Sequence, residues 1–204
     1  MIYRTKHPAI YADLEVASPY LVAEIIDGVL VTRHHGYAAP AMVRTMLAHS
    51  LCDARQTPSN PNTLWQVLTL PEIHLGSDVV VPELAAWSVD RLPFLPDEHV
   101  TIAPDWVCEL TSADPAGNPA LSKKTDLFRR VGVRHLWQVD LRPLSLEAFE
   151  NDGDQWLKIG DWTSDDIVRA PPFDAISFSL AELWPLDKPL GFNEDPQALY
   201  AGDR

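Results

Sequence analysis

The segment WVCELTSADPAGNPALSKKTDLFRRVGVRHLWQVD, at residues 106–140, decides the fold class. Its first five residues, WVCEL, predict a short buried strand, and its last six, HLWQVD, predict a second strand. Between them, TSADPAGNP predicts a loop, and residues 120–131 predict a helix that ends at Gly132. Strand and helix therefore alternate in the part of the chain that carries Glu109 and Lys124.

Further elements lie on both sides of this segment. Periodicity and turn residues predict a helix and then a strand over residues 19–33, a helix over 41–54, and strands at 64–70, 78–81 and 145–151. Gly28 is the predicted turn in the first pair, and NDGD at 151–154 predicts a hairpin turn. The order helix, strands, helix, strands predicts a mixed α/β or α+β sheet flanked by helices.

Composition and charge restrict the classes of function. Asp and Glu outnumber Lys and Arg by 29 to 16, a net charge of −13. Proteins that track phosphates usually carry a basic patch, and the sequence shows none, which argues against tight non-specific binding of DNA. No apolar run reaches the roughly 18 residues of a membrane span. The first residues also lack an apolar signal-peptide core, so we expect a cytoplasmic protein that does not contact a membrane.

Three acidic residues lie within or beside short apolar strands or segments. Glu24 interrupts VAEII, Glu83 follows DVVVP, and Glu109 follows WVC. Buried carboxylates are costly unless they are paired or bind a metal, and two or three at one point suit Mg²⁺ or Mn²⁺. Such an ion can polarise a phosphodiester and activate a water molecule. A nearby lysine would stabilise the developing charge, and Lys124 on the predicted helix is the candidate.

Each of these residues also has a simpler interpretation. An acidic residue at the end of a strand is usually exposed or caps a neighbouring element. Lysines on a helix, such as Lys123 and Lys124, are usually solvated. His34 and His35 lack a third ligand at a recognisable spacing. The residue pattern alone therefore leaves both a metal site and an ordinary surface open.

Four segments of the chain also match a known protein family. They are AEIIDGVL (23–30), LPEIHLGSDVVVPELAAW (70–87), APDWVCELTS (103–112) and KTDLFRRVGVRHLWQVD (124–140). The last contains the family's lysine, an aromatic residue four positions later, and Gly-Val four positions beyond that. With these segments in this order, the chain resembles the Uma-two family of restriction-endonuclease-like proteins, within the PD-(D/E)XK nuclease superfamily.

The resemblance implies a restriction-endonuclease-like mixed sheet with flanking helices. We expect this domain to cover residues 1–184, and the prolines and weak periodicity of residues 185–204 predict a tail. It implies a metal-dependent endonuclease that hydrolyses phosphodiester bonds of nucleic acid, with DNA as the favoured substrate. The implied site contains Glu24, Glu83 and Glu109. Lys124 replaces a lysine that would stand two residues after Glu109, where this chain has Thr111.

Two departures from the family pattern weaken the case for activity. The family's proline-aspartate is Pro82-Glu83 here, and the extra methylene would move a bound ion by about an ångström, a displacement that can cost ~100-fold in rate. Four residues before Lys124 the family has an aspartate, and this chain has Ala120. Asp78 is a possible source of the shorter carboxylate.

The sequence therefore predicts Glu24, Glu83, Glu109 and Lys124 as catalytic residues, with Mg²⁺ or Mn²⁺ bound by Glu83, Glu109 and Asp78. The alternative is a catalytically degenerate nuclease fold that acts as a binding or scaffolding module. A third possibility is a nuclease whose partner protein supplies the basic surface. A homodimer is suggested only by analogy, because cutting both strands of a duplex takes two sites.

Overall fold

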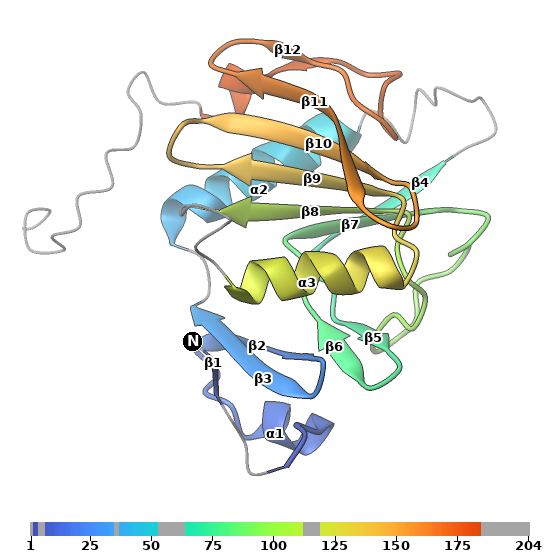
Figure 1. The fold of residues 1–204 in the computed structure, drawn as a ribbon. Coiled ribbons are helices and arrows are strands. Elements are labelled where there is room, and N and C mark those ends of the chain that lie inside the picture. The colour runs from blue at the N-terminus through green and yellow to red at the C-terminus, as the bar shows by residue number, and fades with distance from the viewer. Residues whose placement is uncertain (1, 4–6, 35–36, 53–63, 112–118, 185–204) are drawn as a thin grey trace, which may run out of the picture.

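The computed structural model describes residues 2–3, 7–34, 37–52, 64–111 and 119–184 (Figure 1). Its elements, in chain order, are β1 (Ile2–Tyr3), α1 (Tyr11–Glu15), β2 (Leu21–Ile26), β3 (Val29–His34), α2 (Ala38–Cys52), β4 (Trp65–Thr69), β5 (Ile73–Leu75), β6 (Asp78–Val80), β7 (Leu84–Ser88), β8 (Trp106–Thr111), α3 (Pro119–Arg130), β9 (His135–Asp140), β10 (Ser145–Asn151), β11 (Trp156–Thr163), β12 (Ile167–Val168), β13 (Phe178–Ser179) and the 3-10 helix η3 (Leu180–Leu183). This content confirms the predicted mixed α+β fold class.

Within the described residues, the strands form three sheets. The six-stranded sheet has the order β11-β10-β9-β8-β7-β4, the five-stranded sheet has the order β1-β3-β2-β6-β5, and β12 pairs with β13. Strands β8 and β9 are parallel, whereas the other pairs in the six-stranded sheet are antiparallel. Parallel neighbours need a crossover connection, and α3 lies in the connection between β8 and β9.

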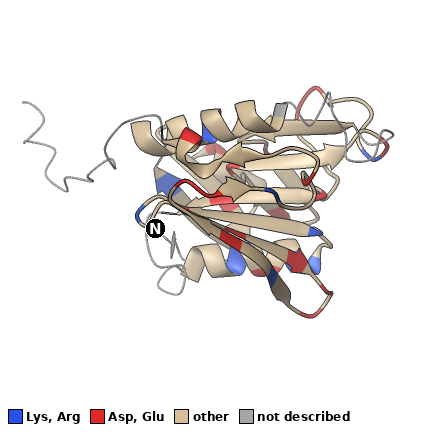
Figure 2. Ribbon diagram, turned by 90° about the horizontal axis from the view of Figure 1, so that it is seen from above, with Lys and Arg blue, Asp and Glu red and all other residues tan. Residues whose placement is uncertain are grey.

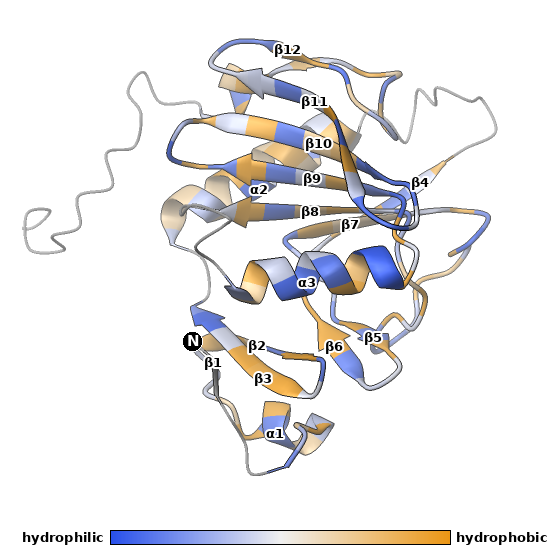
Figure 3. Ribbon diagram, viewed as in Figure 1, coloured by the Kyte–Doolittle hydropathy of each residue, from blue (hydrophilic) through white to orange (hydrophobic). Residues whose placement is uncertain are grey.

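Side-chain alternation along β8 separates two hydrophobic cores. Trp106 and Cys108 point to the core that contains residues of α2 and η3. Val107 points to the opposite core, which contains residues of α3 and of the five-stranded sheet. Figure 1 shows α2 and α3 on opposite faces of the six-stranded sheet, and Figure 3 shows apolar and polar residues alternating along its strands. Glu109 follows the same alternation and therefore faces α3.

The helix predicted for residues 19–28 is wrong, because this stretch forms β2. Asp27 and Gly28 have φ values of 51° and 70° and form a two-residue turn between the paired residues Ile26 and Val29. A two-residue Asp-Gly loop is a strong hairpin signal, and the isoleucines and valines around it favour strands. The hairpin turns Glu24 and Ile26 toward the core below α3, and turns Ile25 toward α1.

The other predicted elements are confirmed, with shifts of a few residues at their ends. The helix at 41–54 is α2, that at 120–131 is α3, and Gly132 ends α3 with a φ of 84°. In the 151–154 turn, Asp152 Oδ1 accepts hydrogen bonds from the backbone N–H groups of Asp154 and Gln155. Strands β1, β5, β7, β12 and β13 have no counterpart among the sequence-based predictions. The predicted tail at 185–204 lies outside the described residues.

Candidate active site

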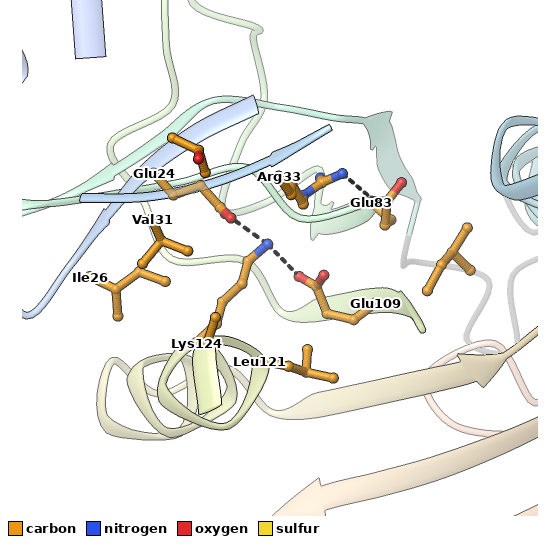
Figure 4. A pocket seen from close by; sticks show the side chains of 11 residues that line it. Glu24, Ile26, Val31, Arg33, Glu83, Glu109, Leu121 and Lys124 are labelled. Atoms are coloured by element: carbon orange, nitrogen blue, oxygen red, sulfur yellow. Dashed lines mark ion pairs between the residues drawn. The ribbon is translucent and has the colours of Figure 1, made fainter. Parts of the chain in front are cut away.

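Four residues predicted from the sequence line a single pocket of about 170 Å³ (Figure 4). Glu24 comes from β2, Glu83 from the turn between β6 and β7, Glu109 from β8 and Lys124 from α3. All four side chains are buried. The interpretation of Lys124 as a solvated helix lysine is therefore wrong, whereas its neighbour Lys123 is exposed.

Helical spacing explains why Lys124 points into the pocket. Leu121 and Phe128 lie three and four residues away on the same face of α3, and both are buried. This face packs toward the core that Val107 of β8 also enters. A lysine on the buried face of a helix needs oxygen partners for its ammonium group, since burial without them is costly.

Lys124 finds these partners on two different sheets. Its Nζ lies 2.8 Å from Glu24 Oε1 and 2.8 Å from Glu109 Oε1, and donates a hydrogen bond of 2.9 Å to the carbonyl oxygen of Val81. Glu24 Oε1 also accepts a hydrogen bond of 2.7 Å from the backbone N–H of Val81. The contact with Glu109 is a close ion pair, and no donor other than Lys124 is found for Glu109 Oε1 among the described residues.

Glu83 is held by two arginines that the sequence analysis did not single out. Arg33 Nη1 lies 2.8 Å from Glu83 Oε1, and Arg44 Nη1 donates a hydrogen bond to Glu83 Oε2. Arg33 also donates a hydrogen bond of 3.2 Å to the carbonyl oxygen of Val81. Arg33 is two residues after Val31 on β3, so strand alternation places both on the pocket side. Once the β2–β3 hairpin is identified, strand alternation alone predicts that Arg33 faces the pocket.

Each of the three carboxylates in the site therefore has a cationic partner. Glu24 and Glu109 share Lys124, and Glu83 has both Arg33 and Arg44. The three positive and three negative side chains balance one another, so the site is close to neutral although the whole chain is strongly acidic. The Arg33 side chain is 29% exposed and that of Arg44 13%, which places these two cations nearest to solvent.

Burial dominates the electrostatics of the deeper pair. It raises the pKa of Glu109 to about 7, an effect that Lys124 opposes and Glu24 reinforces. Burial lowers the pKa of Lys124, but attraction to Glu109 and Glu24 outweighs it, so the net pKa is raised. Clustering of carboxylates predicts a raised pKa for at least one of them, and Glu109 confirms the direction. The main cause is loss of solvent and not repulsion between carboxylates.

Asp78 lies apart from this arrangement. It is not among the residues that line the pocket, and its Oδ1 accepts a hydrogen bond of 2.6 Å from the backbone N–H of Asp27. That bond ties the start of β6 to the β2–β3 turn, and burial raises the pKa of Asp78. Asp78 therefore does not supply the shorter carboxylate for Glu83. Ala120, where the family has an aspartate, lines the pocket and brings no oxygen to it.

The donor set of the pocket fits a hard cation, with one rearrangement. Carboxylate oxygens suit Mg²⁺ or Mn²⁺, and Glu109 Oε1 is a buried oxygen whose close contact among the described residues is the Lys124 ammonium group. In the described part of the chain, Glu24, Glu83 and Glu109 do not form a group whose ligand atoms all lie within 4.8 Å of one another. An ion held by Glu83 would have to displace or share at least one of its arginine contacts.

Comparison with known proteins gives a likeness at the level of fold. No family model matches the chain, and no curated protein matches its sequence. The fold is similar to the crystal structure of a protein from Anabaena variabilis ATCC 29413 that is provisionally described as a nuclease belonging to DUF820. The TM-score is 0.63 at 16% sequence identity, and the match covers 84% of this chain and 94% of the other. The likeness shows that the two proteins share the α+β arrangement described above.

No helix in the described part of the chain combines the length and the apolar character needed to cross a membrane.

Proposed function

We propose that this chain is a metal-dependent nuclease that hydrolyses phosphodiester bonds of nucleic acid, in the restriction-endonuclease-like class. The observation that carries the proposal is the meeting of Glu24, Glu109 and Lys124, from three separate elements, at ion-pair distance in one pocket. These are residues that the family resemblance implies for the site. The similarity of fold to a provisionally described nuclease supports the same class.

Each residue has a distinct part in this proposal. Glu83 and Glu109 would hold Mg²⁺ or Mn²⁺, which polarises the phosphodiester and lowers the pKa of a bound water. Lys124 would donate hydrogen bonds to a phosphate oxygen and stabilise the charge that develops there. Glu24 keeps the lysine in place, because the same Glu24 oxygen is anchored by the backbone N–H of Val81.

Arg33 and Arg44 could bind a phosphate group locally, although the chain as a whole is acidic. Figure 2 shows acidic and basic residues interspersed over the described elements. The two guanidinium groups nevertheless provide local positive charge beside Glu83. A guanidinium group can donate two parallel hydrogen bonds to a phosphate, so these residues are suited to hold the scissile group.

One observation favours the second candidate, a degenerate nuclease fold that binds nucleic acid or protein without cleaving. Both oxygens of Glu83 are already engaged by arginines, and Lys124 forms ion pairs with both Glu24 and Glu109. A site that is fully paired by its own side chains has less need of a metal ion. The two candidates differ in whether the pocket binds Mn²⁺.

A calorimetric titration with Mn²⁺, combined with cleavage assays, separates them. Wild type should bind Mn²⁺ and cleave single- or double-stranded DNA or RNA only when Mg²⁺ or Mn²⁺ is present. Glu109→Ala should lose both properties, whereas Glu150→Ala, a change at an exposed glutamate of β10, should lose neither. If the wild type shows neither Mn²⁺ binding nor metal-dependent cleavage, the scaffold candidate replaces the nuclease.

A further inference from the structure

A second group of metal-binding side chains lies outside the pocket. Glu72, His74 and His99 each offer one ligand atom, and these atoms all lie within 4.8 Å of one another. The site proposed for the nuclease contains none of them. Two imidazoles and a carboxylate also form a softer donor set than three carboxylates, so this group suits a different kind of metal ion.

The backbone fixes the group in place. Ile73 and Val100 form a parallel bridge, in which His74 N–H donates to the Val100 carbonyl at 2.8 Å and Val100 N–H donates to the Glu72 carbonyl at 3.1 Å. Ile73 and Val100 are both buried in the core below α3. In extended chains, neighbouring side chains point to opposite sides, so Glu72, His74 and His99 share the outer side.

The side chains are already in contact with one another. His74 Nε2 lies 2.7 Å from Glu72 Oε1, and the rings of His74 and His99 stack with centroids 3.6 Å apart and planes inclined by 10°. Tyr11, on α1, donates a hydrogen bond of 3.2 Å from its hydroxyl group to the same Glu72 oxygen. Three segments that are distant in sequence therefore converge on Glu72.

The surrounding charge favours a cation. Glu98 Oε2 lies 3.9 Å from His99 Nδ1, which adds a second carboxylate beside Glu72. The Tyr11 hydroxyl group approaches the carboxylate of Glu72 from the side of α1 and donates its hydrogen bond there. In metal sites, residues that hydrogen-bond to a metal ligand hold that ligand in the right orientation, and Tyr11 has this position relative to Glu72.

We propose that Glu72, His74 and His99 bind one Zn²⁺ ion, separately from the carboxylate pocket. Three protein ligands leave a fourth tetrahedral position for water or an external ligand, as in zinc sites that act on substrates. Imidazole lone pairs lie in the ring plane, so one of the stacked rings has to turn about its Cβ–Cγ bond when the ion binds. The side chain of His99 is 31% exposed and borders solvent, which gives it room to turn.

Zinc titration against a chromophoric chelator tests this site. Wild type should bind one Zn²⁺ per chain at the group. His74→Ala and His99→Ala should each weaken binding by at least ~100-fold, and Tyr11→Phe should weaken it by ~10-fold, because losing an outer partner costs less than losing a ligand. His49→Ala is the matched control, since His49 is an exposed histidine on α2, far along the chain from the group. Its affinity should equal that of wild type.

Thermal melts provide a second measurement that does not depend on the chelator. Zn²⁺ should raise the Tm of wild type and of His49→Ala but not that of His74→Ala or His99→Ala, because a ligand stabilises only a fold that binds it. Glu109→Gln should keep full Zn²⁺ affinity, and excess Mg²⁺ should not compete, so the result is independent of the nuclease proposal. The zinc site is ruled out if wild type binds no Zn²⁺, or if both histidine variants bind and melt as wild type does.

Discussion

Lys124 of α3 and Glu24 of β2 form a buried ion pair, with Nζ 2.8 Å from Oε1, that ties the crossover helix to the five-stranded sheet. Only 5% of the lysine side chain and 4% of the glutamate side chain are exposed. Breaking a buried pair by removing one partner leaves a charge without compensation. The pair therefore contributes to stability and is also part of the proposed site. A test of catalysis has to measure both stability and cleavage.

Lys124→Ala should abolish most of the metal-dependent cleavage while Mn²⁺ binding persists, because the carboxylates hold the ion and the lysine acts on the phosphate. The same change should lower the free energy of unfolding by about 3 kcal/mol, the lower end of the range for broken buried pairs, since Glu109 can take up a proton. Cleavage assays, calorimetry with Mn²⁺ and urea unfolding measure the three quantities. Lys123→Ala, next to it on the exposed face of α3, should change none of them, and a similar loss in both variants would contradict the assignment.

Stability should fall as pH rises through the titration range of Glu109. Its pKa is raised from 4.5 to about 7, so between these values the folded state holds more protons than the unfolded chain. Where the native state binds more protons, the free energy of unfolding decreases with increasing pH, and this shift corresponds to about 3 kcal/mol. Glu109→Gln should therefore gain stability relative to wild type between pH 5 and pH 8, when metal is removed by a chelator.

Urea unfolding at pH 5 and pH 8 measures this difference, with Glu150→Gln as the exposed control whose pH profile should follow wild type. A Glu109→Gln protein that is several kcal/mol less stable than wild type at pH 8 would show that the charged carboxylate is a structural partner of Lys124. The Glu109 carboxylate would then have a structural role and would not be an unoccupied metal ligand.

Glu83→Asp tests the departure from the family's proline-aspartate. If the extra methylene has displaced the ion by about an ångström, the shorter side chain should raise kcat/KM for Mn²⁺-dependent cleavage by ~10-fold or more. Glu83→Gln keeps the length but removes the charge, and it should be inactive. Equal activity of Glu83→Asp and wild type would show that side-chain length at this position does not set the ion's place.

The sequence predicts best what depends on local pattern. The strands β8 and β9, the helix α3 and the candidates Glu109 and Lys124 lie within one contiguous segment, where strand and helix signals are strong. The sequence predicts a helix in place of β2 because the apolar run around Glu24 fits a helix as well as a strand, and a glycine such as Gly28 can end either element.

Residues brought in by long-range packing could not be found in this way. Arg44 is on α2 and meets Glu83 only because α2 packs near the end of the six-stranded sheet, which no local pattern encodes. Asp78 shows the reverse case. It is close to Glu83 in sequence, yet its carboxylate accepts a hydrogen bond from the backbone N–H of Asp27 in the β2–β3 turn. Spacing along the chain therefore identified candidate ligands but not their partners.

Arg33, one of the two arginines that contact Glu83, should weaken the binding of the metal ion and strengthen the binding of nucleic acid. Arg33→Ala removes a cation that occupies Glu83 Oε1, so Mn²⁺ affinity should rise, whereas affinity for DNA should fall because a phosphate contact is lost. Losing one phosphate contact should also reduce the slope of log affinity against log salt by about 0.9 for duplex DNA. Calorimetry with Mn²⁺ and fluorescence anisotropy at several salt concentrations measure these quantities, with Arg142→Ala as an exposed control. If Arg33→Ala weakens Mn²⁺ binding, or leaves the salt slope unchanged, Arg33 is a structural partner of Glu83 and does not contact phosphate.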